Sequence, residues 1–297
     1  MGGKSSLKST AKAYLYLAPA LIIILVFSIW PILRSFTMGF YTEYNFFTRE
    51  VTARGIDNFV WLYNSPRFHL ALINTLTFVL GVVPITIIIS LTIALGIHSI
   101  MKGSTFFRSV YFLPHVTSTI AVATVFQWIF HTNHGILNYI LGLFGIDNIA
   151  WLTNPDYAMA ALIIMSVWRS LGFGTVLLLA GLQSIDKGLY LAAKVDGANK
   201  FHRFKTVTLP MLSPTLFFLS IVSVISSFRV FSEIFALFRD SPGPGNSALT
   251  VVYFIYQEYF ENWNMGRAAA GATVLFVIIF IVTMIQMLVG KKLVHYK

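Results

Sequence analysis

The sequence predicts an all-α protein that crosses a membrane six times, and three observations support this fold class. Hydrophobic residues make up 57% of the chain and charged residues only 11%, whereas about a quarter of the residues in a soluble domain are charged. Six apolar runs each supply the roughly 20 residues that a spanning helix needs, and the runs are too long for strands. Lys and Arg residues gather in alternate connections between the runs, which is typical of multi-pass membrane proteins.

The six expected spans define one transmembrane domain. They lie between Lys12 and Arg34, from about Leu70 to Ser99, between Arg108 and His131, from about Tyr157 to Leu182, from about Leu209 to Phe238, and between Arg267 and Lys291. Proline inside a span is tolerated where neighbouring helices satisfy the freed backbone groups. We therefore assign residues 13–290 to the transmembrane domain and residues 1–12 and 291–297 to short terminal tails.

Positive charge predicts the orientation of these spans, because cytoplasmic loops carry the excess of Lys and Arg. The basic residues in the two tails and in the second and fourth connections are Lys4, Lys8, Lys12, Lys102, Arg108, Lys187, Lys194, Lys200, Arg203, Lys205, Lys291, Lys292 and Lys297. The other connections carry mixed or acidic charge. Both termini and the connection at residues 183–210 are therefore expected in the cytoplasm.

The remaining composition limits the chemistry. The net charge of +10 would suit nucleic acid in a soluble protein, but in a membrane protein it is the expected signature of cytoplasmic loops. The chain has no cysteine, which excludes disulfides, thiolate metal sites and cysteine nucleophiles. His131 and His134 have no third ligand beside them, so we expect no metal site. Gly3-Lys4-Ser5 lacks the upstream glycine of a P-loop, and no nucleotide site is visible.

The most informative segment is the polar, basic connection at residues 190–210, which reads YLAAKVDGANKFHRFKTVTLP. Two adjacent small residues, Ala192 and Ala193, allow a short helix to approach another surface closely. Asp196 can cap that helix, and Gly197 can turn the chain because it tolerates positive φ. A second short helix is expected to follow.

The aromatic residues Phe201 and Phe204 would lie on one face of that second helix. The segment as a whole resembles the cytoplasmic "EAA" coupling loop of ABC importer permeases. In that family Glu-Ala-Ala, two variable residues and Asp-Gly-Ala precede an apolar, aromatic stretch that ends in Leu-Pro. The residues in register are Ala192, Ala193, Asp196, Gly197, Ala198, Phe201, Phe204, Leu209 and Pro210, and the assigned loop also includes Tyr190 and Leu191. Leu191 departs from the pattern, because it occupies the position of the usual Glu.

The resemblance extends over roughly residues 10–290. The chain looks most similar to the carbohydrate-uptake subfamily, which includes maltose, multiple-sugar and glycerol-3-phosphate permeases, and within it to the first of the two permease subunits. The flanking positions that resemble the family are Gly55–Phe59, Asn74-Thr75, Tyr111–Pro114, Trp151-Leu152, Val167–Arg169, Gly172-Phe173, Ala180–Ile185 and Pro242–Asn246.

The resemblance implies a type I ABC importer permease in the bacterial cytoplasmic membrane, together with its partners. These are a second homologous permease subunit, two cytoplasmic ATPase subunits and an extracytoplasmic solute-binding protein. ATP and Mg would be bound by the ATPase subunits, whose closure would move the coupling loop and switch the path from inward-facing to outward-facing. This chain would hold no catalytic residue and no cofactor.

Charged residues inside the spans are candidates for the solute path, because their burial is costly. Arg169 lies midway along the fourth span beside Trp168, whose ring can cover the apolar face of a sugar while Arg169 donates hydrogen bonds. The resemblance places the region from Trp168 to Thr175, which includes Gly172, on the substrate path. A structural Arg169, satisfied by backbone carbonyls or a partner chain, stays open as the alternative.

A second group of candidates lies on the fifth span. Arg229 and Glu233 are four residues apart, so they can pair on one helix face. Ser223 and Ser227 accompany them, although small hydroxyl residues are also ordinary packing residues between membrane helices. We therefore hold a solute-path role and a packing role open for this group.

The predicted function is the permease subunit of an ATP-driven importer for a sugar or oligosaccharide. Glycerol-3-phosphate or another polyol or acidic solute is the alternative substrate. A secondary transporter is the alternative class, but the two halves of the chain show neither paired broken helices nor an acidic ion relay. A membrane enzyme would need clustered catalytic groups, which the connections do not offer.

Overall fold

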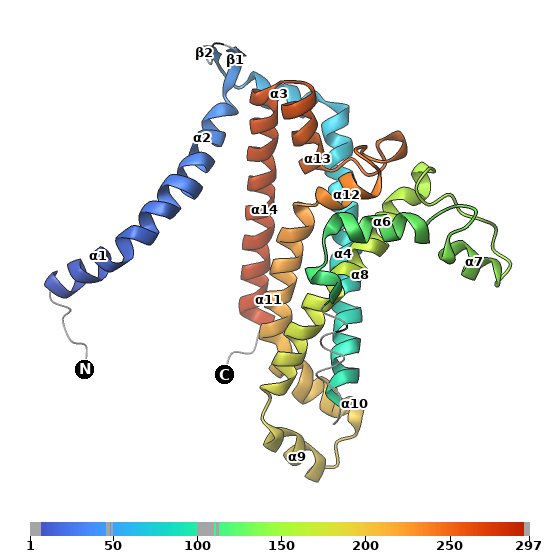
Figure 1. The fold of residues 1–297 in the computed structure, drawn as a ribbon. Helices are drawn as coiled ribbons and strands as arrows, with labels where there is room; N and C mark the ends of the chain where they lie inside the picture. Colours follow the sequence, from blue (N-terminus) through green and yellow to red (C-terminus); the bar gives the residue numbers. More distant parts are fainter. Residues whose placement is uncertain (1–6, 46–47, 49, 100–109, 111–112, 294–297) are drawn as a thin grey trace. The chain divides into compact units, whose positions relative to one another are not determined.

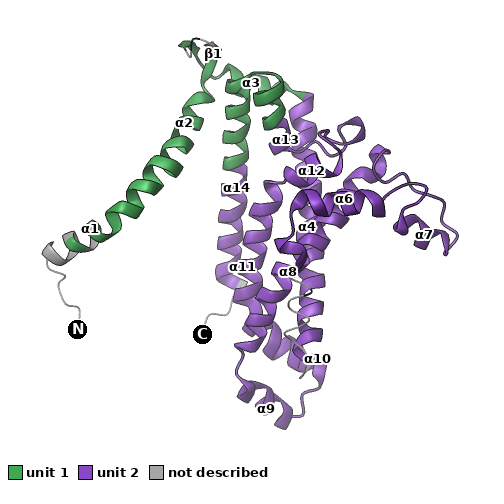
Figure 2. Cartoon of the chain, in the orientation of Figure 1, with its two compact units in different colours: residues 1–65, 255–276 green, residues 66–254, 277–297 purple. Residues whose placement is uncertain are grey.

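The computed structural model describes residues 7–45, 48, 50–99, 110 and 113–293. The described chain is helical almost throughout, as the predicted fold class requires (Figure 1). It divides into two compact units. The first comprises residues 1–65 and 255–276, and the second residues 66–254 and 277–297 (Figure 2).

The first unit begins with a long apolar helical segment. It consists of α1 (Leu7–Ile24), a π-helical turn (Leu25–Ile29) and α2 (Trp30–Met38). The π turn lies just before Pro31. Proline has no backbone N–H to donate within a helix, and its ring crowds the carbonyl group four residues earlier. A local widening of the helix accommodates such a residue. The helix begins at Leu7, inside the stretch that the sequence assigned to the N-terminal tail.

A small hairpin and a short helix follow, which the sequence did not predict. They are β1 (Tyr41–Asn45), the antiparallel β2 (Glu50–Arg54) and α3 (Asp57–Asn64). The buried Asn58 amide donates to the carbonyls of Gly39 (3.1 Å) and Tyr41 (2.9 Å), which fixes the start of the hairpin. Gly266 allows close packing here, because a Cβ at that position would lie 2.4 Å from the Tyr41 carbonyl oxygen.

The second unit contains most of the helices. They are α4 (Pro66–Ser99), α6 (Thr119–Ile129), α7 (Ile136–Gly142), α8 (Pro155–Gln183), α9 (Lys187–Val195), α10 (Lys200–Arg203), α11 (Leu209–Phe228) and α12 (Ser232–Leu237), with a 3₁₀ turn at Pro244–Asn246 and the first four residues of α13 (Val251–Tyr256). A π turn (Gln257–Glu261) and the start of α14 (Met265–Leu293) belong to the first unit, and α14 continues into the second from Val277.

Helices α4, α8 and α11 pack together and form the core of the second unit. Its buried residues are Ala94, Ile97, Leu178, Leu179, Leu182, Ile185, Leu212 and Leu219. Two glycines of α8 bring the helices close: a Cβ on Gly174 would lie 2.5 Å from Ser90 Oγ, and one on Gly181 would lie 2.7 Å from Thr215 Oγ1. Such small residues are typical of helix interfaces within membranes.

Five described helices are long and apolar enough to cross a membrane: Tyr14–Met38, Pro66–Ser99, Pro155–Gln183, Lys200–Phe228 and Met265–Lys292. The expected third span, between Arg108 and His131, falls partly outside the described residues. Its described part includes α6, whose 11 residues extend about 16 Å at 1.5 Å per residue. The count of six spans therefore stays a prediction.

The expected fifth span, from Leu209 to Phe238, is wrong as one continuous helix. Helix α11 ends at Phe228, where the Arg229 N–H donates to the carbonyls of Ser226 and Ser227. The chain then turns, and α12 begins at Ser232. The residues after the break, Ile234 to Phe238, are again apolar, so a hydropathy average over a long window continues across it.

Candidate functional site

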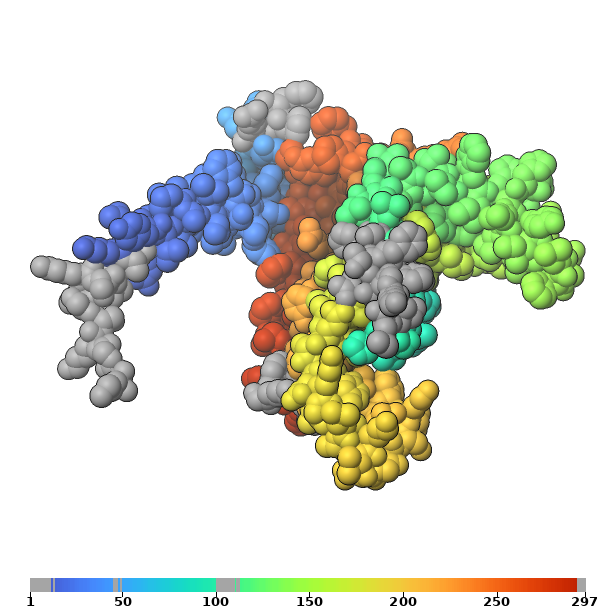
Figure 3. Space-filling view, turned by 60° about the horizontal axis from the view of Figure 1, so that its bottom comes forward, coloured from blue at the N-terminus to red at the C-terminus, as the bar shows by residue number. Residues whose placement is uncertain are grey.

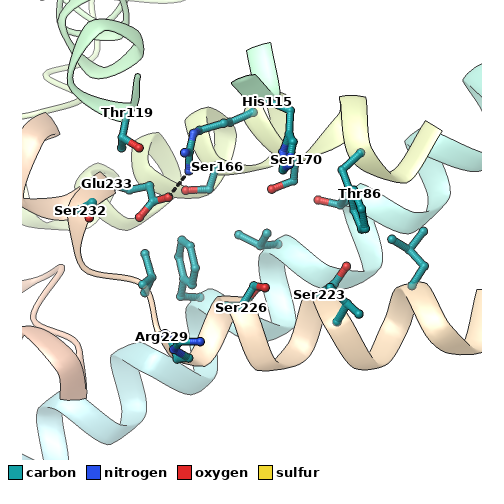
Figure 4. A pocket seen from close by; sticks show the side chains of 18 residues that line it. Thr86, His115, Thr119, Ser166, Ser170, Ser223, Ser226, Arg229, Ser232 and Glu233 are labelled. Atoms are coloured by element: carbon teal, nitrogen blue, oxygen red, sulfur yellow. Dashed lines mark hydrogen bonds and ion pairs between the residues drawn. The ribbon is translucent and has the colours of Figure 1, made fainter. Parts of the chain in front are cut away.

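A cavity of about 550 Å³ lies in the second unit, lined by residues from α4, α6, α8, α11, α12 and the connections between them (Figure 4). Hydroxyl side chains dominate its polar lining. They are Thr86, Thr119, Ser166, Ser170, Ser223, Ser226, Ser227 and Ser232. His115, Arg169, Arg229 and Glu233 add ionisable groups, and Phe173 adds an aromatic ring. We call this space the inner cavity.

An ion pair crosses the wall of the inner cavity. Arg169 Nη1 of α8 lies 2.6 Å from Glu233 Oε1 of α12, and the two side chains are 27% and 18% exposed. The dashed line in Figure 4 marks this contact. The expected pair between Arg229 and Glu233 is wrong: α11 ends at Phe228, just before Arg229, and Glu233 belongs to α12, so the two residues do not share one continuous helix.

Several polar atoms at the inner cavity have no partner within the part of the chain that the structure describes. They are Thr86 Oγ1, Ser166 Oγ and Arg169 Nε, and all three are buried. A buried polar group without a hydrogen bond costs about 1–3 kcal/mol. These atoms therefore favour a polar occupant with several hydroxyl groups or water molecules.

Five of the eight expected path residues line the inner cavity: Arg169, Ser223, Ser227, Arg229 and Glu233. The other three, Trp168, Gly172 and Thr175, do not. The Trp168 ring is 43% exposed and packs edge-on against Phe126 with 5.4 Å between ring centroids. Gly172 and Thr175 are buried along α8.

Helical geometry explains which residues of α8 the sequence interpretation missed. Ser166 and Phe173 lie three residues before and four residues after Arg169, so helical spacing places all three on one face. This spacing could have identified Ser166 and Phe173. Thr86, by contrast, reaches the cavity through the packing of α4 against α8, and no local pattern marks it.

The segment that resembles a coupling loop folds as a helix, a turn and a second short helix. Asp186 Oδ1 accepts from the Gly188 N–H (2.8 Å) at the start of α9, and Asn199 Oδ1 accepts from the His202 N–H (2.8 Å) at the start of α10. Gly197 makes the turn with φ +74°. Asp196 is the C-cap residue of α9 and caps that helix through its backbone N–H, while the Asn199 side chain caps the start of α10.

A hydrogen bond joins this knob, residues 186–204, to the base of α11. Tyr190 Oη lies 3.0 Å from Thr208 Oγ1. Thr208 ends the π turn (Phe204–Thr208) that leads directly into α11. Tyr190 and Val207 also pack against the core of the second unit. The first helix of the knob is therefore tied to a helix that lines the inner cavity.

The knob presents apolar side chains to its surroundings. Leu191 is 64% exposed, Val195 88% and Phe201 75%, and Leu191 and Val195 lie four residues apart on one helix face. Phe204, which was expected on the same helix face as Phe201, is half-buried, whereas Phe201 is exposed. In Figure 1 the knob projects from the end of the second unit that is opposite α12, and in Figure 3 its yellow residues protrude from that unit.

The model of one protein family matches most of the chain. Residues 72–295 match the family described as "Binding-protein-dependent transport system inner membrane component". The matched region contains the inner cavity and the knob.

Individual relatives agree with this match over nearly the whole chain. The lactose transport system permease protein LacF of Rhizobium radiobacter is 36% identical, over 96% of this chain and 95% of its own. The arabinooligosaccharides transport system permease protein AraP of Bacillus subtilis (strain 168) is 34% identical, over 93% of this chain and 88% of its own. A chain in the crystal structure of a bacterial ABC transporter that imports the acidic polysaccharide alginate aligns with a TM-score of 0.81 and 25% identity, over 97% of this chain and 98% of that chain.

Proposed function

Because the chain belongs to the family of binding-protein-dependent transport system inner membrane components and is a permease subunit of an ABC importer, we propose that its solute is an oligosaccharide. The inner cavity is the proposed binding site on the path. The residues that we assign to solute contact are Arg169, Ser223, Ser227, Arg229 and Glu233, with Thr86 and Ser166.

The hydroxyl-rich lining of the inner cavity carries this proposal. Each Ser or Thr hydroxyl both donates and accepts hydrogen bonds, and a sugar hydroxyl does the same. Arg169 donates and Glu233 accepts, so the ion pair offers both kinds of group to one solute. Buried unpaired atoms at Thr86, Ser166 and Arg169 would gain partners when a sugar binds. The names of LacF and AraP, which are sugar permeases, support the same solute class.

The knob is the proposed contact with the ATPase subunits. Its apolar face at Leu191 and Val195 is exposed, and a partner surface would cover it. We assign Tyr190, Leu191, Ala192, Ala193, Asp196, Gly197, Ala198, Phe201, Phe204 and Pro210 to this contact or to its hinge. The ATPase subunits would bind ATP and Mg, and this chain would act without a catalytic residue.

Lys and Arg in the knob and the terminal segments support a cytoplasmic position for both. The other proposed partners are a second permease subunit, which would complete the path, and a solute-binding protein on the outer side. The family description itself names dependence on a binding protein.

Reconstitution of the complete transporter tests the proposal. Proteoliposomes that contain this chain, its partner permease and its ATPase subunits are supplied with the solute-binding protein and with labelled lactose, arabino-oligosaccharides, uronate oligosaccharides or glycerol-3-phosphate. We expect ATP-dependent uptake of an oligosaccharide. Uptake of glycerol-3-phosphate alone would contradict the proposed solute, and uptake driven by an ion gradient without ATP would contradict the transport class.

A further inference from the structure

A second cavity, of about 490 Å³, lies in the second unit where α6 ends and α8 is about to begin. We call it the outer cavity. Its lining includes Gln127 and Phe130 at the end of α6, Thr153 before α8, and Phe238 and Arg239 after α12. Its volume lies within the range of roughly 300–1,000 Å³ that small-molecule sites occupy. No sequence pattern pointed to this cavity.

Hydrogen bonds from two side-chain amides to backbone carbonyls fix the segments that form the outer cavity. Gln127 Nε2 donates to the carbonyls of Ala236 (2.9 Å) and Leu237 (3.1 Å), which joins α6 to the end of α12. Asn74 Nδ2 of α4 donates to the carbonyls of Asn246 (3.0 Å) and Leu249 (3.1 Å), which fixes the loop after α12. The cavity is therefore preformed, and its framework does not depend on an occupant.

The loop at the rim adopts an uncommon backbone conformation. Arg239 and Asp240 have φ of 52° and 60°, in the left-handed region that residues other than glycine seldom occupy. The Asp240 N–H donates to the Phe235 carbonyl (3.0 Å), which holds this turn against α12. Strained backbone that the surrounding structure holds in place is concentrated at ligand-binding sites.

Arg239 is an exposed cation on this rim, and it forms no ion pair with any described residue. The described lining of the outer cavity contains no Asp or Glu. Thr153 adds a hydroxyl beside the apolar surface of Phe130 and Phe238. A cation, a hydroxyl and apolar surface together suit a sugar ring that carries a carboxylate, because Arg binds a carboxylate through two parallel hydrogen bonds.

The outer and inner cavities follow one another along the same two helices. On α12, Glu233 lines the inner cavity and Leu237 lines the outer one, and four residues of helix rise about 6 Å. On α6, Thr119 lines the inner cavity and Gln127 the outer one, and α6 packs against α12. One elongated solute lying along these helices would therefore meet both cavities.

We propose that the outer cavity is a second saccharide subsite, in which Arg239 binds the carboxylate of an acidic sugar unit while another unit of the same chain occupies the inner cavity. The inference rests on the proposed oligosaccharide function and narrows its substrate class to acidic oligosaccharides. It assigns Arg239 as a specificity-determining residue.

The test compares two sugars that differ by one charge. The complete transporter in proteoliposomes, with its binding protein, receives either a neutral oligosaccharide or its uronate counterpart, and kcat/KM for uptake is measured for each. Arg239→Gln should lower the value for the uronate about tenfold or more, as expected for the loss of a charge-assisted hydrogen bond, and should leave the neutral sugar nearly unchanged. Arg239→Lys should restore part of the preference, because it restores the charge.

Arg54→Gln is the matched control, because it removes the same charge from a residue that packs over the Tyr41 ring (5.4 Å) and does not line the cavity. The control should behave like wild type with both sugars. Should Arg239→Gln fail to insert, Arg239→Asn removes the same charge and tolerates the left-handed backbone.

Three outcomes would overturn the subsite. They are unchanged uptake of both sugars by Arg239→Gln, equal loss for both sugars, and weakened affinity for the sugar-free binding protein, which would make the cavity a protein-docking site. Wild-type transporter that imports neither sugar would overturn the proposed function itself, and the subsite with it.

Discussion

Arg169 and Glu233 form an ion pair of 2.6 Å that ties α8 to α12 at the wall of the inner cavity. They lie 64 positions apart in the sequence, and each was a candidate for the solute path on separate grounds. Both side chains are partly exposed to the cavity. The ion pair can therefore serve two roles. It holds α12 against α8, and it offers a hydrogen-bond donor and an acceptor to a bound solute.

Removing one charge of this ion pair should impair transport more than swapping the two charged residues. Glu233→Gln and Arg169→Gln each leave the other charge without its partner in a partly buried site, which is strongly unfavourable. We expect each single variant to lower uptake at least about tenfold, which corresponds to roughly 1.4 kcal/mol. The exchanged variant Arg169→Glu/Glu233→Arg should recover part of that loss. Uptake per molecule inserted in the membrane is the measurement, and full activity of both single variants would contradict the role.

Gly197→Val should uncouple the ATPase from transport without unfolding the spans. The glycine has φ +74°, and nothing lies within 4 Å of a Cβ built there. The expected defect is therefore backbone strain of roughly 1–2 kcal/mol rather than a clash within the chain. The protein should insert at normal levels, while uptake and receptor-stimulated ATP hydrolysis fall together. Gly197→Asn, which tolerates this conformation better, is the control, and normal transport by Gly197→Val would refute the hinge.

Leu191→Glu should be tolerated. Leu191 is 64% exposed at the surface of the knob, so a carboxylate there disturbs no core of this chain, and Val195 still presents an apolar side chain to the ATPase. The usual family residue at this position is also acidic. Co-purification of the ATPase subunits with the variant should match wild type. Loss of that association would show that the register assigned to residues 190–210 is wrong.

Tyr190→Phe should weaken the link between the knob and α11. The change removes the 3.0 Å contact to Thr208 and leaves a buried hydroxyl without its partner, which costs about 1 kcal/mol. Thr208→Val combined with Tyr190→Phe should cost less than the sum of the single changes, because neither hydroxyl then remains unpaired. Thermal stability of the purified complex measures this coupling, and strictly additive losses would exclude it.

Cysteine labelling tests the proposed orientation, and the chain offers a clean background because it has no cysteine. Lys200→Cys, in the exposed knob, should resist an impermeant thiol reagent in intact cells. Asn133→Cys, in the exposed connection between α6 and α7, should react. The reverse pattern would overturn the orientation.

Local patterns in the sequence were sufficient for much of the fold. Apolar runs predicted α4, α8 and α14 to within a few residues, because a helix within a membrane must satisfy its own backbone hydrogen bonds. Gly197 and the small residues before it predicted the helix, turn and helix of the knob, because positive φ and close approach are properties of single residues. Charge inside a span marked Arg169 and Glu233 as candidates, because burying charge is costly wherever it occurs.

Local sequence patterns could not predict which residues of different helices contact each other. The partner of Glu233 is Arg169 and not Arg229, because the end of α11 at Phe228 places Glu233 on a separate helix that faces α8. Thr86 reaches the inner cavity, and Trp168 does not, because of how α4 and α8 are rotated about their axes. A run of apolar residues does not reveal how a helix is rotated about its axis or which helix it packs against. The packing of helices that are distant in the sequence determines which side chains meet. The inner and outer cavities form between these packed helices, so no single segment of the sequence encodes them.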